Sequence, residues 1–140
     1  MIRAVLDVNV LVSALIKPNG TPGQVLDMWR AGHFLILVSE AILVELDDVL
    51  KRPRLRNKYR LADDVVSRLL RGLGRFTIAV TAGAEESAVR DSDDAKLLSC
   101  AAAGGADYIV SGDKDLLSLS EYEGVAIVTP SDFVRILSGR

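Results

Sequence analysis

The stretch VLDVNVLVSA (residues 5–14) is almost entirely apolar, as expected of a strand buried in a parallel sheet. It nevertheless carries Asp7 and Asn9. An ionised carboxylate beside a hydrophobic core is costly unless another group or an ion pairs with it. The stretch therefore predicts a buried strand over residues 2–7 and a binding partner for the Asp7 carboxylate.

Short apolar segments alternate with amphipathic segments along the rest of the chain. The expected strands cover residues 2–7, 34–39, 75–80, 107–111 and 125–129. The expected helices cover residues 20–34, 39–53, 62–74, 91–105 and 130–139, with a short helical turn at 113–119. This alternation predicts an α/β protein with three layers, α/β/α, and a mostly parallel central sheet of about five strands.

The composition is typical of a globular protein, and we expect one domain over residues 1–140. Hydrophobic residues make up 49% of the chain and charged residues 26%, with a formal net charge of −2. The single cysteine, Cys100, excludes an internal disulfide and a cysteine-based zinc site. The chain starts directly with MIRAVLD, with no signal sequence and no apolar run of membrane-spanning length. We therefore expect a cytoplasmic protein without membrane contact.

Three acidic residues are expected near the carboxyl edge of the sheet, where ligands bind in open α/β folds. Asp7 follows the first strand, and Asp113 follows the fourth. Asp94 lies near the start of a helix and shares a helical face with the apolar Leu97 and Ala101. Asp94 is therefore predicted to point inward, towards the other two acids.

The helix expected over residues 39–53 offers a fourth acid, and its periodicity leaves the choice open. Glu45 borders the apolar stripe on one side, and Asp47 borders it on the other. A solvated flank of the helix is the structural alternative for either residue.

Carboxylates gathered at one edge need a compensating charge. Each pair of unit charges 4 Å apart costs roughly 4 kcal/mol at an effective dielectric constant of 20, so protons or cations must intervene. Oxygen ligands without a nearby histidine or thiolate favour Mg²⁺ or Mn²⁺ over zinc. His33, the only histidine, follows a helix stop, and we interpret it as structural or exposed. Histidine-based acid–base or triad chemistry is therefore not expected.

Three motifs carry a resemblance to a known family: LDVNVLVSA, SEAILVEL and DSDDAKLLSCAAAGGADYIVSGDKDLL, in this order. The chain resembles PIN-domain ribonucleases over nearly its whole length, in particular the toxin component of bacterial VapBC-like toxin–antitoxin pairs. The resemblance implies four catalytic acids, Asp7, Glu45, Asp94 and Asp113, and it selects Glu45 over Asp47. It also implies that Asp7, Asp94 and Asp113 hold the metal ion.

The resemblance assigns supporting roles to three further residues, Asn9, Ser111 and Asp115. Val8 is a departure, because the family usually places a threonine between the first acid and Asn9. This change removes a hydroxyl group but no metal ligand. The resemblance further implies Mg²⁺- or Mn²⁺-dependent hydrolysis of RNA phosphodiester bonds, an antitoxin protein as partner, and a homodimer.

The segment KRPRLRNKYR (residues 51–60) is strongly basic and contains no acid. A solvated helical connection and a contact with the phosphates of RNA both explain it. The basic residues of the second interpretation are Lys51, Arg52, Arg54, Arg56, Lys58 and Arg60.

Two other functions are weighed against the nuclease. The segments DVNV and SGDKD weakly resemble motifs of haloacid-dehalogenase phosphatases. Those enzymes need a second aspartate at the position where this chain has Asn9. The amide of Asn9 cannot serve as a general acid or base. A binding or regulatory module with the same fold is the non-catalytic alternative, and the presence of all four acids weighs against it.

Overall fold

The computed structural model describes residues 1–81 and 92–139. The strands are β1 (Arg3–Leu6), β2 (Leu35–Val38), β3 (Ile78–Ala79), β4 (Tyr108–Val110), β5 (Glu121–Tyr122) and β6 (Val125–Val128). The helices are α1 (Val8–Ile16), α2 (Thr21–Arg30), α3 (Glu40–Leu50), α4 (Pro53–Tyr59), α5 (Asp63–Arg75), α6 (Ser92–Gly104), α7 (Lys114–Leu119) and α8 (Pro130–Leu137).

In the described part of the chain, six strands form one sheet in the order β3-β2-β1-β4-β6-β5. The first five strands in this order pair in parallel, and β5 joins β6 as an antiparallel edge. β1 lies between β2 and β4, so the centre of the sheet comes from the N-terminal strand. Leu6 and Val110 are register partners at the ends of β1 and β4. The segments that follow these two strands therefore start side by side.

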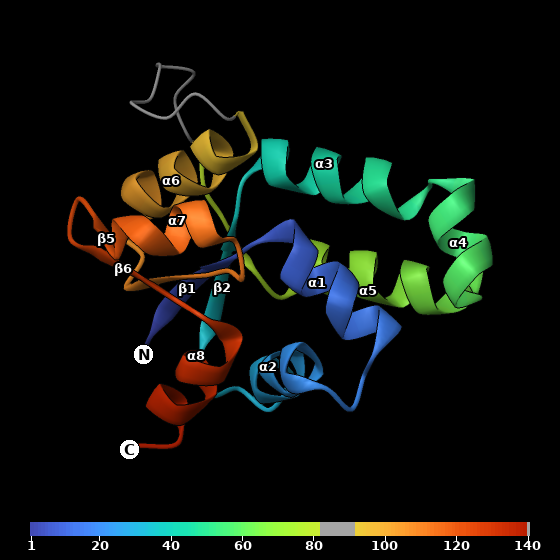
Figure 1. The fold of residues 1–140 in the computed structure, drawn as a ribbon, viewed down its shortest axis with the longest axis horizontal. Coiled ribbons are helices and arrows are strands. Elements are labelled where there is room, and N and C mark those ends of the chain that lie inside the picture. Colours follow the sequence, from blue (N-terminus) through green and yellow to red (C-terminus); the bar gives the residue numbers. More distant parts are fainter. Residues whose placement is uncertain (82–91, 140) are drawn as a thin grey trace.

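Helices cover both faces of the sheet (Figure 1). On one face α6 packs against β1, β2 and β4, while α7 contacts β6. On the other face α2 and α8 pack together, and Phe133 of α8 meets the ring of Phe34 edge-on at a centroid distance of 4.9 Å. Buried apolar side chains from both layers form one continuous cluster among the described residues. The predicted three-layer α/β/α class is confirmed, with six strands where about five were expected.

Helix α1 is the main departure from the sequence-based expectation. Its residues Val8, Val10 and Val12 are β-branched and lower the intrinsic helix propensity, so the stretch looks like a strand. The chain changes from strand to helix at Asp7. The side chain of Asp7 accepts a hydrogen bond from the backbone N–H of Asn9 (3.2 Å) and caps α1. Most of α1 is buried, and tertiary packing therefore outweighs propensity.

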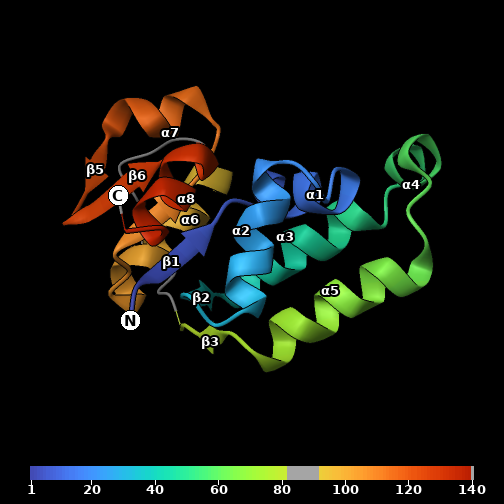
Figure 2. The same cartoon turned by 90° about the horizontal axis from the view of Figure 1, so that it is seen from below.

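Two smaller differences concern the strands: the edge strand β5 was not expected, and β3 is shorter than the predicted strand at 75–80. α4 lies within the basic segment 51–60, for which a helical connection was one interpretation. The expected helix at 91–105 corresponds to α6, and Asp91 lies outside the described residues. α3, α4 and α5 extend to one side of the sheet around α1, as both views show (Figures 1 and 2). Among the described residues, no helix has the length and apolar character needed to cross a bilayer.

Candidate active site

Two helix caps bring Asp7 and Asp113 to the same edge of the sheet. Asp7 follows β1 and caps α1, while Asp113 follows the neighbouring β4 by a short turn and caps α7 with a hydrogen bond from the N–H of Asp115 (3.2 Å). The backbone N–H of Asp7 donates to the carbonyl of Val110 (3.0 Å) and continues the parallel ladder to this edge. Strand order and helix capping both contribute to these positions.

Ser111 joins these two acids. Its Oγ donates a hydrogen bond to Asp7 Oδ2 (2.6 Å) and accepts one from the backbone N–H of Asp113 (3.0 Å). Ser111 is fully buried, and its own N–H donates to the carbonyl of Val128 in the next strand (3.0 Å). Together with the bond from Asn9, these contacts engage both oxygens of the Asp7 carboxylate. The orientation of Asp7 is therefore set before any ligand binds.

Two further acids reach the same place from helices that start at this edge. Asp94 lies near the start of α6 and is buried, as predicted from its inward face. Glu45 projects from α3. A cavity of about 500 Å³ is lined by these residues together: Asp7, Val8, Asn9, Glu45, Asp94, Leu97, Gly112 and Asp113. The structure thus brings all four predicted acids into one cavity.

Glu45 and Asp47 have different surroundings in the structure. Glu45 lines the cavity, whereas Asp47 accepts an ion pair from Lys51 one helical turn later (Nζ–Oδ2 2.7 Å). The hydrogen bond and charge of Asp47 raise the pKa of Lys51 above its ordinary value. Asp47 thus has a local partner on α3, and Glu45 remains the α3 acid that faces the site.

Lys96 is not among the residues that line the cavity, but it contacts Glu45, which is, and the sequence did not predict this contact. Its ammonium group lies 3.5 Å from Glu45 Oε1, and this contact bridges α6 and α3. Lys96 follows Asp94 by two positions, about 200° around the helix, so periodicity places it off the inward face. Only the length of its side chain brings the charge back to the acid, and no sequence pattern predicts this.

The donor atoms of the cavity suit a hard divalent cation. All four acids offer carboxylate oxygens, and neither His33, which is exposed, nor Cys100, which is buried outside the cavity lining, adds a softer ligand. Within residues 1–81 and 92–139, however, no three His, Cys, Asp or Glu side chains stand in an arrangement that could hold one ion. The chemistry of the ligands fits Mg²⁺ or Mn²⁺, while the side chains themselves have not closed around a common point.

The predicted supporting residues take different positions. Asn9 is exposed at the cavity and contributes its backbone N–H to Asp7. Asp115 is exposed and is not among the lining residues; it contributes its backbone N–H to Asp113. The structure therefore supports Asp115 as part of the α7 cap and offers no contact between its carboxylate and the cavity.

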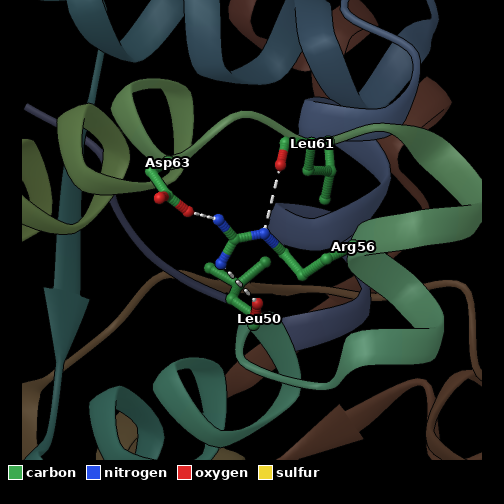
Figure 3. A network of polar contacts seen from close by, with 4 residues as sticks. All are labelled: Leu50, Arg56, Leu61 and Asp63. Atoms are coloured by element: carbon green, nitrogen blue, oxygen red, sulfur yellow. Dashed lines mark hydrogen bonds and ion pairs between the residues drawn. The ribbon is translucent and has the colours of Figure 1, made fainter.

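The basic segment is partly structural. Arg56 points back into the protein, where Nε donates to the carbonyl of Leu61 (3.1 Å), Nη1 to the carbonyl of Leu50 (3.2 Å), and Nη2 pairs with Asp63 (Figure 3). These contacts tie the end of α3 to α4 and to the start of α5. Arg56 thus has contacts within the protein that connect these helices. The exposed basic residues of the segment are Lys51, Arg52, Arg54, Lys58 and Arg60.

Cys100 is a buried free thiol on α6. Burial raises its pKa from 9.0 to about 11, and a hydrogen bond with Ser39 offsets part of that rise. A thiol with this pKa is protonated at neutral pH and has little nucleophilic character. Cys100 is therefore part of the core and takes no part in the chemistry of the cavity.

A family model and a sequence relative both match most of the chain. Residues 3–115 match a family model described as PIN domain. The uncharacterized protein MJ1680 of Methanocaldococcus jannaschii is 31% identical over 141 residues, which cover 95% of this chain and 90% of that protein.

Two solved structures share the fold at low sequence identity. One is PAE2754 from Pyrobaculum aerophilum, with a TM-score of 0.62 and 16% identity, covering 99% of this chain and 91% of that one. The other is VapBC2 from Rickettsia felis bound to a DNA fragment from their promoter, with a TM-score of 0.59 and 18% identity, covering 91% and 98%.

Proposed function

The chain belongs to the PIN domain family, and on that premise we propose that it is a divalent-metal-dependent endoribonuclease formed by one domain over residues 1–140. PIN domains are generally nucleases. The observation that carries the proposal is the meeting of Asp7, Glu45, Asp94 and Asp113, from four separate parts of the sequence, in one cavity. Asp7 and Asp113 each cap a helix, but capping does not require that they share a cavity with Glu45 and Asp94.

The metal site would use Asp7, Asp94 and Asp113 as ligands, with Mg²⁺ or Mn²⁺ as the ion. Glu45 would orient the attacking water or assist in holding the ion. A bound divalent ion lowers the pKa of water and stabilises negative charge on phosphate oxygens.

The residues around the four acids orient the metal ligands and shape the cavity. Ser111 holds Asp7 in place and accepts a hydrogen bond from the backbone N–H of Asp113, so one hydroxyl group connects the two acidic residues. The N–H of Asn9 orients the other oxygen of Asp7. Val8 and Leu97 give the cavity apolar walls that limit access of bulk water to part of the site. We expect products with a 5′-phosphate and a 3′-hydroxyl.

The exposed basic residues around α4 supply a surface for RNA phosphates. Lys51 and Arg52 follow α3, the helix that carries Glu45, and Arg54 and Lys58 lie on α4. Each lysine or arginine that contacts a phosphate releases counterions, so binding should weaken with salt. Lys58 also lies over the ring of Tyr59, 5.2 Å from its centroid, which keeps this aromatic face beside a positive charge.

We further propose that the protein is the toxin of a toxin–antitoxin pair. The supporting observations are the motifs shared with such toxins and the fold shared with VapBC2 of Rickettsia felis. This role implies a cytoplasmic protein, an antitoxin partner and a homodimer. A short open reading frame for a DNA-binding protein directly beside the gene is the simplest genomic check.

The test is incubation of the purified protein with total cellular RNA, with Mn²⁺ and with EDTA, beside the variant Asp94→Ala. We expect Mn²⁺-dependent fragments with 5′-phosphate ends from the wild type only. Failure to cleave any RNA with Mg²⁺ or Mn²⁺ present would favour the non-catalytic binding module. Turnover of a small phosphomonoester in place of RNA would favour the phosphatase.

A further inference from the structure

The contact between Lys96 and Glu45 places a cation beside one of the acids that line the candidate cavity. The Lys96 ammonium lies 3.5 Å from Glu45 Oε1, and the two side chains are 32% and 21% exposed. An ion pair that is shielded from solvent to this extent is screened less than a surface pair. The pair also joins α6, which carries Asp94, to α3.

We infer that Lys96 is the resident counter-ion of Glu45 and takes the place that a second divalent ion would otherwise occupy. The cavity then accepts one divalent ion, on the side of Asp7, Asp94 and Asp113. This inference rests on the proposed function, because it concerns the number of metal ions at the same site.

Charge and geometry both support this division. A divalent ion shared with Glu45 would stand within a few ångströms of the ammonium group, and two cations at that distance repel strongly in a partly buried site. Asp7 and Asp113, by contrast, are linked through Ser111. They belong to the strand edge, whereas Glu45 belongs to the pair with Lys96.

A direct count of bound Mn²⁺ tests the inference without any activity measurement. Free Mn²⁺ is measured by electron paramagnetic resonance during titration of the metal-free protein. The variants are Lys96→Met, which keeps the length but removes the charge, and Lys96→Arg, which keeps the charge. Lys114→Met is the matched control, because Lys114 is exposed on α7, whereas Lys96 is partly buried in its ion pair with Glu45. Circular dichroism checks the fold, and Lys96→Gln replaces Lys96→Met if that variant does not fold.

We expect one bound Mn²⁺ per chain for the wild type, Lys96→Arg and Lys114→Met. We expect two for Lys96→Met, and again one when Glu45→Gln is added to it. Two ions in the wild type, or one in Lys96→Met and Lys96→Gln, would overturn the inference alone. Binding of no Mn²⁺ by any of these proteins would overturn the proposed function and the inference with it.

Discussion

Ser111 Oγ donates a 2.6 Å hydrogen bond to Asp7 Oδ2, between residues that are 104 positions apart in the sequence. The same oxygen accepts from the N–H of Asp113 (3.0 Å). One buried hydroxyl group thus connects the acids that follow β1 and β4. The arrangement of the candidate site depends on this contact as well as on the strand order.

Replacing Ser111 with alanine should loosen this connection. The change removes a buried hydrogen-bonding partner of Asp7 and of the Asp113 N–H, which costs about 1–3 kcal/mol of unfolding free energy. Urea unfolding measures the loss, and the rate of RNA cleavage should fall with it. Ser118→Ala is the control, because the Ser118 hydroxyl is exposed and bonds only locally to the carbonyl of Asp115, and it should stay within about 0.5 kcal/mol of wild type. Equal stability of the two variants would argue against this role of Ser111.

Replacing Asp7 with asparagine should separate catalysis from folding. Asparagine caps helices about as well as aspartate and keeps a polar group beside Ser111, so the unfolding free energy should change less than in Asp7→Ala, which loses both the cap and the partner of the buried Ser111 hydroxyl, at a cost of about 1–3 kcal/mol. The lost negative charge removes an attraction of about 4 kcal/mol per unit charge at 4 Å and an effective dielectric constant of 20. Cleavage by Asp7→Asn should therefore fall by at least about 100-fold.

Asp27→Asn is the matched control for that change, since Asp27 forms an exposed ion pair with Arg30 on α2, outside the cavity lining. Thermal melting and initial cleavage rates measure both effects. Wild-type activity in Asp7→Asn would remove Asp7 from the site.

Replacing Arg56 with alanine should destabilise the junction of α3, α4 and α5. Three contacts are lost, including one to the last carbonyl of α3 and one to a carbonyl between α4 and α5, and the expected cost is about 1–3 kcal/mol. Arg54→Ala, on the same helix but exposed, should change the unfolding free energy by less than about 0.5 kcal/mol. Arg54→Ala should instead weaken RNA binding and reduce its dependence on salt. The opposite pattern would mean that Arg56 contacts RNA and Arg54 supports the fold.

The buried thiol of Cys100 predicts a pH dependence of stability. Its pKa is about 11 in the folded protein, compared with 9.0 for an ordinary thiol. Between these values the unfolded chain loses the proton and the folded chain keeps it, so stability falls as the pH rises from about 9 to 11, by up to roughly 3 kcal/mol. Below pH 9 both states are protonated and the thiol has no effect.

The measurement is the unfolding free energy of wild type and Cys100→Ala across this pH range. The variant should lose the part of the pH dependence that the thiol supplies, whatever its absolute stability. Alkylation by iodoacetamide at pH 8 should also be slow in the native protein and fast in urea. Rapid alkylation of the native protein would mean that the thiol is accessible.

Periodicity and turn chemistry predicted most of the fold, and physical reasons explain the exceptions. The parallel strands and the helices after them follow from apolar runs bounded by caps, such as Ser39 before α3. α1 was missed because its valines favour a strand and only burial makes them helical. β5 is two residues long and depends on pairing with β6, which no local pattern specifies.

The residues of the candidate site also include some that the sequence predicts and others that it does not. The carboxyl ends of the predicted parallel strands and the inward face of the helix predict that Asp7, Asp94 and Asp113 lie together, because strands and helix faces are visible in the local sequence. Glu45 and Asp47 could be separated only by family resemblance until the structure placed Asp47 beside Lys51. Lys96 could not be predicted, because its contact with Glu45 depends on the packing of α6 against α3 and on side-chain length.

The central claim is that carboxylates from distant parts of the chain meet in order to hold a divalent ion. Its most direct test is an anomalous difference map, recorded at the manganese absorption edge, from crystals of the protein grown or soaked in MnCl₂. The account predicts a peak in the cavity, within bonding distance of oxygens of Asp7, Asp94 and Asp113, and no such peak in Asp94→Ala crystals. A map without a peak in that cavity at saturating MnCl₂, or an equal peak in Asp94→Ala, would contradict it.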